Sequence, residues 1–119
     1  MARTISAAAT LSGASATTKT TLYTIPPKNT GLWSMMYVIS TDGTETPKVF
    51  WYDKTADEEF KILEGKNLGA GEYILFSDAV VALQEDDEIR VQNAGTTNDV
   101  TYIATITLTP AEAIQFHGS

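Results

Sequence analysis

TTLYTIPPKNTGLWSMMYVIS, residues 20–40, is the stretch that decides the fold class of this chain. Residues 20–25 alternate in character with a period of two, which is the spacing of a β-strand. The strand must end at Pro26-Pro27, because neither proline can donate a backbone hydrogen bond to a sheet. Residues 29–31, Asn-Thr-Gly, are typical of a turn. One face of this first strand is expected to carry Thr21, Tyr23 and Ile25.

A second strand is predicted where the apolar run restarts at Leu32. It is apolar on both faces, so we expect it at the centre of a sheet, with one face in the core and the other against further packing or a partner. One face is expected to carry Trp33, Met35, Tyr37 and Ile39, and the other Leu32, Met36 and Val38.

Further short extended runs follow, separated by turn residues such as Asp42-Gly43 and the glycine-rich segment 68–72. The last run alternates most regularly, with apolar residues on one face and mainly threonines on the other, as suits an outer sheet surface. This pattern predicts an all-β, single-domain antiparallel β-sandwich of about seven or eight strands, either a jelly roll or a related Greek key. An immunoglobulin-like sandwich is the alternative. The additional strands are expected at residues 47–54, 59–63, 73–76, 79–83, 89–91 and 100–109.

The chain divides into a sandwich domain at residues 19–109, an N-terminal segment at 1–18 and a C-terminal tail at 110–119. The N-terminal segment is rich in Ala, Ser and Thr. It is expected either to add an edge strand to the sheet or to form an arm that orders against a partner. The partner-binding residues proposed for this segment are Arg3, Thr4, Ile5 and Leu11.

Composition excludes several functions. The chain has 8 Lys+Arg against 15 Asp+Glu, a formal net charge of −7, which disfavours nucleic-acid binding. It has no cysteine, so disulfides and thiolate chemistry are excluded. We expect neither a signal peptide nor a membrane span, because no apolar stretch is long enough.

Catalytic and metal-binding patterns are weak, so we expect no enzyme activity, cofactor or metal. His117, the single histidine, lies in the tail and cannot complete a catalytic triad within the fold. The acidic run 85–88 lacks the spacing of a calcium loop and is more typical of a solvated connection before the strand at 89–91. Acids 57–59 are more typical of a charged turn than of a glycosidase pair. The glycines at 65, 69 and 71 lack the following helix that a phosphate site uses.

Aromatic residues leave open a second class of function, a carbohydrate-binding module. Such a module would need a flat platform of exposed rings on which sugars could stack. Core packing is the stronger interpretation for most of these residues. The candidates are Trp33, Tyr37, Trp51, Tyr52 and Tyr73.

Four ordered segments together resemble small virion proteins of tailed bacteriophages. They are residues 20–26 (TTLYTIP), 51–53 (WYD), 68–72 (LGAGE) and 87–91 (DEIRV). The resemblance spans roughly residues 20–109 and implies a structural virion protein without catalytic residues.

Within that family, the resemblance favours a capsid decoration (cement) protein that binds the outer surface of the head. A neck, tail or fibre-adaptor protein is the nearest alternative. The implied partners are the major capsid protein or another virion protein, together with further copies of the chain, with trimers favoured. Assembly would take place in the cytoplasm of the bacterial host.

Overall fold

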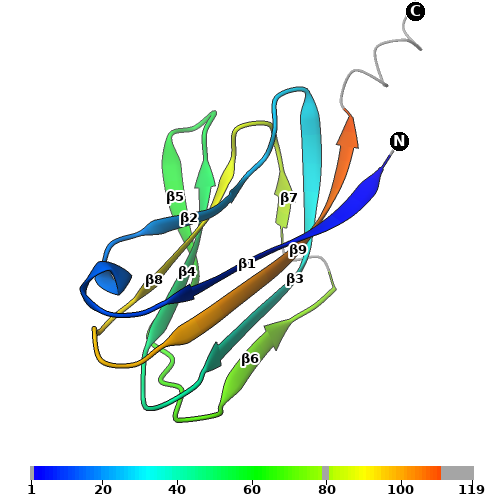
Figure 1. Ribbon diagram of the computed structural model, residues 1–119. Helices are drawn as coiled ribbons and strands as arrows, with labels where there is room; N and C mark the ends of the chain where they lie inside the picture. Colours follow the sequence, from blue (N-terminus) through cyan, green and yellow to red (C-terminus); the bar gives the residue numbers. More distant parts are fainter. Residues whose placement is uncertain (1, 79–80, 111–119) are drawn as a thin grey trace, which may run out of the picture.

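The computed structural model describes residues 2–78 and 81–110, which form two antiparallel sheets packed face to face (Figure 1). The five-stranded sheet has the order β1-β9-β3-β6, with β7 also paired to β3, and the four-stranded sheet has the order β2-β8-β4-β5. In the described part of the chain the only helix is a single 3₁₀ turn, η1. The elements are β1 (Arg3–Leu11), η1 (Ala14–Thr17), β2 (Thr20–Thr24), β3 (Asn29–Ser40), β4 (Pro47–Asp53), β5 (Glu58–Leu63), β6 (Tyr73–Phe76), β7 (Val81–Leu83), β8 (Glu88–Asn93) and β9 (Val100–Pro110).

The pairing follows the jelly-roll pattern. The chain folds back on itself, so that β1 pairs with β9, β2 with β8, β3 with β6 and β4 with β5. Successive pairs then wrap into two sheets, with β1 and β2 on opposite sheets. The predicted all-β sandwich is confirmed, with nine strands in the described part of the chain where about seven or eight were expected. The immunoglobulin-like alternative is wrong, because that fold places its first two strands in the same sheet.

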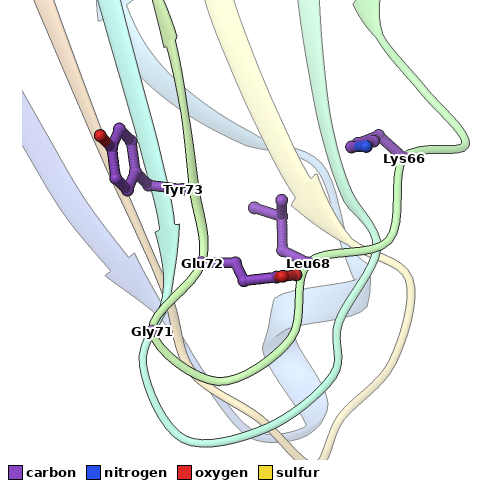
Figure 2. A pocket seen from close by; sticks show the side chains of 5 residues that line it. All are labelled: Lys66, Leu68, Gly71, Glu72 and Tyr73. Carbon is purple, nitrogen blue, oxygen red and sulfur yellow. The ribbon is translucent and has the colours of Figure 1, made fainter.

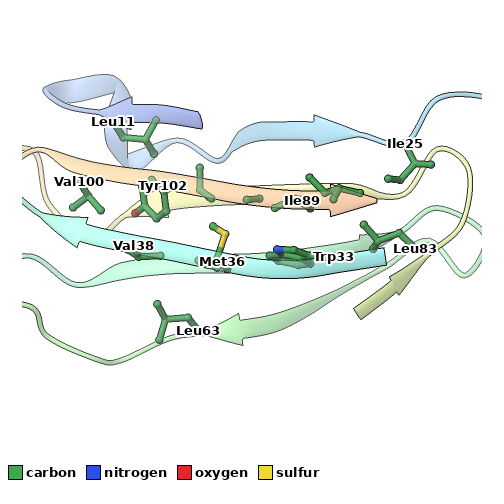
Figure 3. Close-up of a cluster of buried hydrophobic side chains, with 14 of the residues drawn as sticks. Leu11, Ile25, Trp33, Met36, Val38, Leu63, Leu83, Ile89, Val100 and Tyr102 are labelled. Atoms are coloured by element: carbon green, nitrogen blue, oxygen red, sulfur yellow. The ribbon is translucent and has the colours of Figure 1, made fainter. Parts of the chain in front are cut away.

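The core fills the space between the two sheets (Figure 3). The five apolar residues predicted for one face of the last strand, β9, are all buried there, and the threonine face points outward. Trp33 is the largest fully buried side chain and lies between the sheets with Met36 and Val38. The buried β9 residues are Val100, Tyr102, Ala104, Ile106 and Leu108.

The predicted faces of β3 are wrong at Leu32 and Trp33, because a β-bulge at Ser34 changes the alternation. The register with β9 shifts between Trp33 and Met35, so one extra residue is inserted and the alternation changes phase. Trp33 therefore shares the core face with Met36 and Val38, not with Met35. The bulge also leaves the Met35 carbonyl free to accept a hydrogen bond from the buried indole Nε1 of Trp33, at 3.2 Å.

The predicted face of β2 is wrong for the same reason, because a second bulge separates Thr21 from Tyr23. The register with β8 shifts between Thr21 and Tyr23. Thr21 therefore points outward, where its hydroxyl donates to Glu88 at 2.9 Å, and Tyr23 packs against the core.

The turn after β2 lies earlier than predicted. Pro27 and Lys28 make the turn, with Lys28 at a φ of 63°, and residues 29–31 already belong to β3. Gly31 is required by packing and not by a turn, because a Cβ there would lie 2.7 Å from Cδ1 of Ile25.

The N-terminal segment contributes an edge strand. β1 pairs with β9 over nine consecutive residues, from Arg3 opposite Leu108 to Leu11 opposite Val100. Leu11 belongs to the core and Ile5 packs against it, so removal of this segment would expose apolar surface in the body. Residues 111–119 of the predicted tail lie outside the described residues, as do Ala79 and Val80 of the predicted strand at 79–83.

Candidate interaction surface

The outer face of the five-stranded sheet carries no charged side chain in the described strands. Residues that lie opposite one another in an antiparallel sheet point to the same side, so the pairing identifies the members of this face. We call it the uncharged face. It consists of Thr4, Ser6, Ala8 and Thr10 from β1; Thr101, Ile103, Thr105, Thr107 and Thr109 from β9; Thr30, Leu32, Met35, Tyr37 and Ile39 from β3; Tyr73 and Leu75 from β6; and Ala82 from β7.

One half of the uncharged face is apolar. Tyr37 lies between Ile103 and Leu75, and Ile39 lies opposite Tyr73. We call these five residues the apolar patch. Tyr73 is 59% exposed and Leu75 is 51% exposed. Since single exposed apolar side chains are common but contiguous groups are not, the patch is typical of a surface that binds another molecule.

The other half of the uncharged face is made of short hydroxyl side chains on β1 and β9. Three pairs of them meet across the strands: Thr4 with Thr107 at 3.2 Å, Ser6 with Thr105 at 3.5 Å, and Thr10 with Thr101 at 2.8 Å. These hydroxyl groups form a hydrogen-bonding surface. Removing water from it costs less free energy than removing water from a charged surface.

The outer face of the four-stranded sheet has the opposite character. The carboxylate of Glu59 accepts hydrogen bonds from Lys19 at 2.5 Å and from Arg90 at 3.1 Å. Arg90 also pairs with Glu88 at 2.9 Å and lies 4.0 Å from the centre of the Tyr52 ring. Lys19, Glu59, Arg90 and Glu88 are therefore paired with one another within the fold, and this sheet presents an ionic surface.

We predict that the ionic surface makes stability depend weakly on acid pH. Burial alone would raise the pKa of Glu59, but the hydrogen bonds from Lys19 and Arg90 outweigh it and lower the pKa below its ordinary value of 4.5. A carboxyl with a lowered pKa in the fold stabilises above its unfolded pKa and loses that contribution as the pH falls. Glu59→Gln should therefore reduce stability by about 1 kcal/mol or less at pH 7. In urea denaturation, the difference between the two proteins should shrink as the pH falls below the ordinary value of 4.5. A difference that stays constant throughout the acid range would contradict this assignment.

Two pockets border the uncharged face, one at each end of β3. A pocket of about 390 Å³ is lined by Lys66, Leu68, Gly71, Glu72 and Tyr73 (Figure 2). The carboxylate of Glu72 accepts a hydrogen bond from the Gly69 N–H at 2.6 Å and so stabilises the turn before β6. The second pocket, of about 360 Å³, is lined by Thr30, Gly31, Leu32, Ala82, Leu83, Gln84, Thr107 and Thr109.

The four partner-binding residues proposed from the sequence do not form one surface. Thr4 lies on the uncharged face, whereas Arg3, Ile5 and Leu11 lie on the opposite side of β1. Leu11 is 8% exposed, and Ile5 is half-buried against the core. Arg3 is exposed at the start of the strand.

The five aromatic residues considered as a sugar platform are not brought together either. Trp33 is buried, Trp51 packs against the core with its ring stacked on Phe60, and Tyr52 lies on the ionic surface. Only Tyr37 and Tyr73 are neighbours, with ring centroids 5.5 Å apart and planes tilted by 38°.

The acidic runs have structural uses. Asp87 is 1% exposed, and its carboxylate accepts hydrogen bonds from Trp51 Nε1, the Lys54 N–H and the Gln84 N–H. Asp57 accepts a hydrogen bond from the Tyr52 hydroxyl at 2.5 Å, which helps to raise the pKa of that tyrosine.

His117 lies outside the described residues. Within residues 2–78 and 81–110, no group of three or more His, Cys, Asp or Glu residues is placed to hold a metal ion.

No helix of the described part is both long and apolar enough to cross a membrane.

The fold and this surface define a small jelly-roll protein with one uncharged, partly apolar sheet face. No protein-family model matches the chain, and no curated protein matches it. Among solved structures, a chain of the acid-stable capsid of Helicobacter pylori bacteriophage KHP30 has a TM-score of 0.56 at 10% identity, covering 92% of this chain and 94% of that chain.

Two further structures have similar scores. A chain from Bacillus endospore appendages, which form disulfide-linked pili, has a TM-score of 0.51 at 14% identity, with 90% of this chain and 85% of that chain covered. A chain from T=1 particles derived from infectious bursal virus has a TM-score of 0.54 at 9% identity, with 94% of this chain covered. The present chain spans 32% of that longer chain. At such identities the likeness shows the fold alone, a jelly roll that is also present in virus particles.

Proposed function

We propose that this chain is a non-enzymatic structural protein of a bacteriophage virion, and that it decorates the outer surface of the head by docking through the uncharged face. The observation that carries the proposal is the contrast between an acidic chain, with a net charge of −7, and a five-stranded sheet whose outer face has no charge in its described strands. The jelly roll shared with a phage capsid chain and the ordered segments that resemble phage virion proteins both support it.

The chemistry of the uncharged face suits docking on a folded protein shell. The apolar patch can bury large side chains in the centre of a contact, and the hydroxyl groups of β1 and β9 can hydrogen-bond around it. The centres of protein interfaces are depleted of charged residues, as this face is. Many copies on one shell would also gain from symmetry, with trimers at threefold positions as one arrangement.

Leu75 offers the sharpest test, because its side chain belongs to the apolar patch and is 51% exposed. Leu75→Lys would place a solvated ammonium group where the proposal requires a dry contact. We expect it to weaken binding at least about tenfold. The measurement is co-sedimentation of the purified protein with heads of its own phage from which this protein has been removed.

Thr55→Lys is the matched control. It adds the same charge at an exposed position in the turn between β4 and β5, away from the uncharged face. Binding should stay at the wild-type level, and circular dichroism should show that both variants are folded. If Leu75→Lys sediments with heads as well as the wild type does, the uncharged face is not the docking surface.

Copy number separates decoration from a role in the neck, tail or fibre adaptor. Decoration of a head requires on the order of hundreds of copies per virion, whereas a neck or tail component occurs as one or a few rings. Quantitative mass spectrometry of purified virions, with the major capsid protein as the internal standard, distinguishes the two. A ring-like copy number would overturn decoration and favour the neck or tail.

A further inference from the structure

Three of the four sheet edges are protected against pairing with another chain. β2 has five residues, contains a bulge and is followed by Pro26. β5 carries Glu58, Glu59 and Lys61. The far edge of the five-stranded sheet is divided between β6, with four residues, and β7, with three. Short strands, bulges, prolines and charges are the usual means by which proteins prevent edge-to-edge association.

β1 has none of these protections. It runs for nine residues, pairs with β9 without a register shift, and has no partner strand on its other side among the described residues. Its one charged residue, Arg3, is at the first position, and its centre is Ala7-Ala8-Ala9. The small uncharged side chains at the centre of this edge place neither a charge nor bulk in the way of a second backbone.

We propose that two copies of this chain associate by pairing β1 with β1 across a twofold axis. The occupant of the edge is a second copy because the strand is self-complementary. In an antiparallel pairing centred on Ala7, Thr4 lies opposite Thr10 on the outer face, and Ile5 lies opposite Ala9 on the inner face. The two Arg3 residues then lie at opposite ends of the new pair, so no like charges meet.

This pairing joins the two five-stranded sheets into one continuous sheet. Because the twofold axis is perpendicular to the sheet, both uncharged faces lie on the same side. If the proposed docking is correct, the pair would bind its shell through two faces at once, and binding would be strengthened by effective concentration. Pairing itself does not depend on docking, so either proposal can fail while the other stands.

Sedimentation velocity of the full chain over a range of concentrations tests the pairing. The wild type should form a dimer that dissociates on dilution. The double variant Ser6→Lys/Ala8→Lys keeps both residues on the outer face but places lysine opposite lysine across the pair. Its dimer dissociation constant should be about tenfold weaker or more.

Thr101→Lys/Thr105→Lys is the matched control. These positions are on the same outer face, one strand inward on β9, where they lie opposite Thr10 and Ser6. The control should still dimerise, and thermal melts should show that both double variants are folded. A dimer lost in the control but kept in the β1 variant would mean that the faces stack on each other, which overturns edge pairing. A wild type that is monomeric or trimeric at all concentrations would also overturn it.

Ala7→Cys provides a test independent of charge. The chain has no cysteine, so the introduced thiols are the only ones present. At the centre of an antiparallel pair their Cα atoms would be about 5 Å apart, which permits a disulfide. Mild oxidation should yield a covalent dimer with Ala7→Cys but not with Thr55→Cys. Equal yields from the two variants would overturn the proposed pairing.

Discussion

Trp33→Ala should reduce the free energy of unfolding by about 3–5 kcal/mol. Trp33 has no exposed surface, lies between the two sheets and is the largest fully buried side chain. Its loss removes buried apolar area and leaves a cavity that the paired strands cannot readily close. The Met35 carbonyl would also lose the hydrogen bond that it accepts from the indole. Since small domains are stable by only about 5–15 kcal/mol, urea denaturation followed by circular dichroism should show a large shift of the midpoint.

Leu32→Ala is the control for this prediction. Leu32 is the adjacent residue on the same strand but is 42% exposed on the uncharged face. Its replacement should cost about 1 kcal/mol or less, because most surface substitutions have small effects. Equal losses for the two variants would show that the bulge does not direct Trp33 into the core.

The fold class and the approximate positions of most strands were predictable from the sequence, because they follow from alternation, prolines and turn residues. The side to which each residue points was predictable only in strands without a bulge. β9 has none against β1, and both of its predicted faces are confirmed. In β2 and β3 an extra residue changes the phase, and no residue type in either strand marks that position. The bulge depends on pairing between strands far apart in the chain, which a local pattern does not contain.

The uncharged face was visible in part. Its two central strands are β9 and β3. The sequence predicts the threonine face of β9 and the apolar character of both faces of β3. The second apolar face of β3 was expected to be covered, whereas in the structure it remains half-exposed. What could not be predicted is that β1 and β6 extend the same face, because this requires knowledge of the sheet order. The sequence therefore contained the composition of the surface but not its extent.

Asp87 is the residue that sequence reasoning misplaced most clearly. The sequence predicts that it belongs to a solvated acidic connection, whereas in the structure it is buried where three loops meet. Its side chain bonds residues of β4 and of the two turns that follow β4 and β7. Its backbone carbonyl accepts a hydrogen bond from the Ile25 N–H at 3.0 Å, which attaches the loop after β2. Asp87 is one of four consecutive acids at 85–88, and nothing in the local sequence distinguishes it from the other three.

We therefore expect Asp87→Ala to lower the free energy of unfolding by about 3 kcal/mol or more. The substitution leaves three N–H groups without their acceptor: Trp51 Nε1, formerly at 3.2 Å, the Lys54 N–H at 3.0 Å and the Gln84 N–H at 2.9 Å. A buried donor left without a partner costs about 1–3 kcal/mol, partly relieved where water can enter. Urea denaturation measures the loss, and the near-ultraviolet circular dichroism of Trp51 should change with it.

Two further variants separate burial from charge. Glu85→Ala removes a neighbouring acid that is exposed, so its effect should stay within about 0.5 kcal/mol. Asp87→Asn keeps one acceptor oxygen but turns an amide N–H₂ toward a donor, so its loss should approach that of Asp87→Ala. If Asp87→Ala and Glu85→Ala were equally mild, water would be replacing the carboxylate at all three donors. The junction of the three loops would then be held by backbone hydrogen bonds such as that between Ile25 and Asp87, rather than by the side chain.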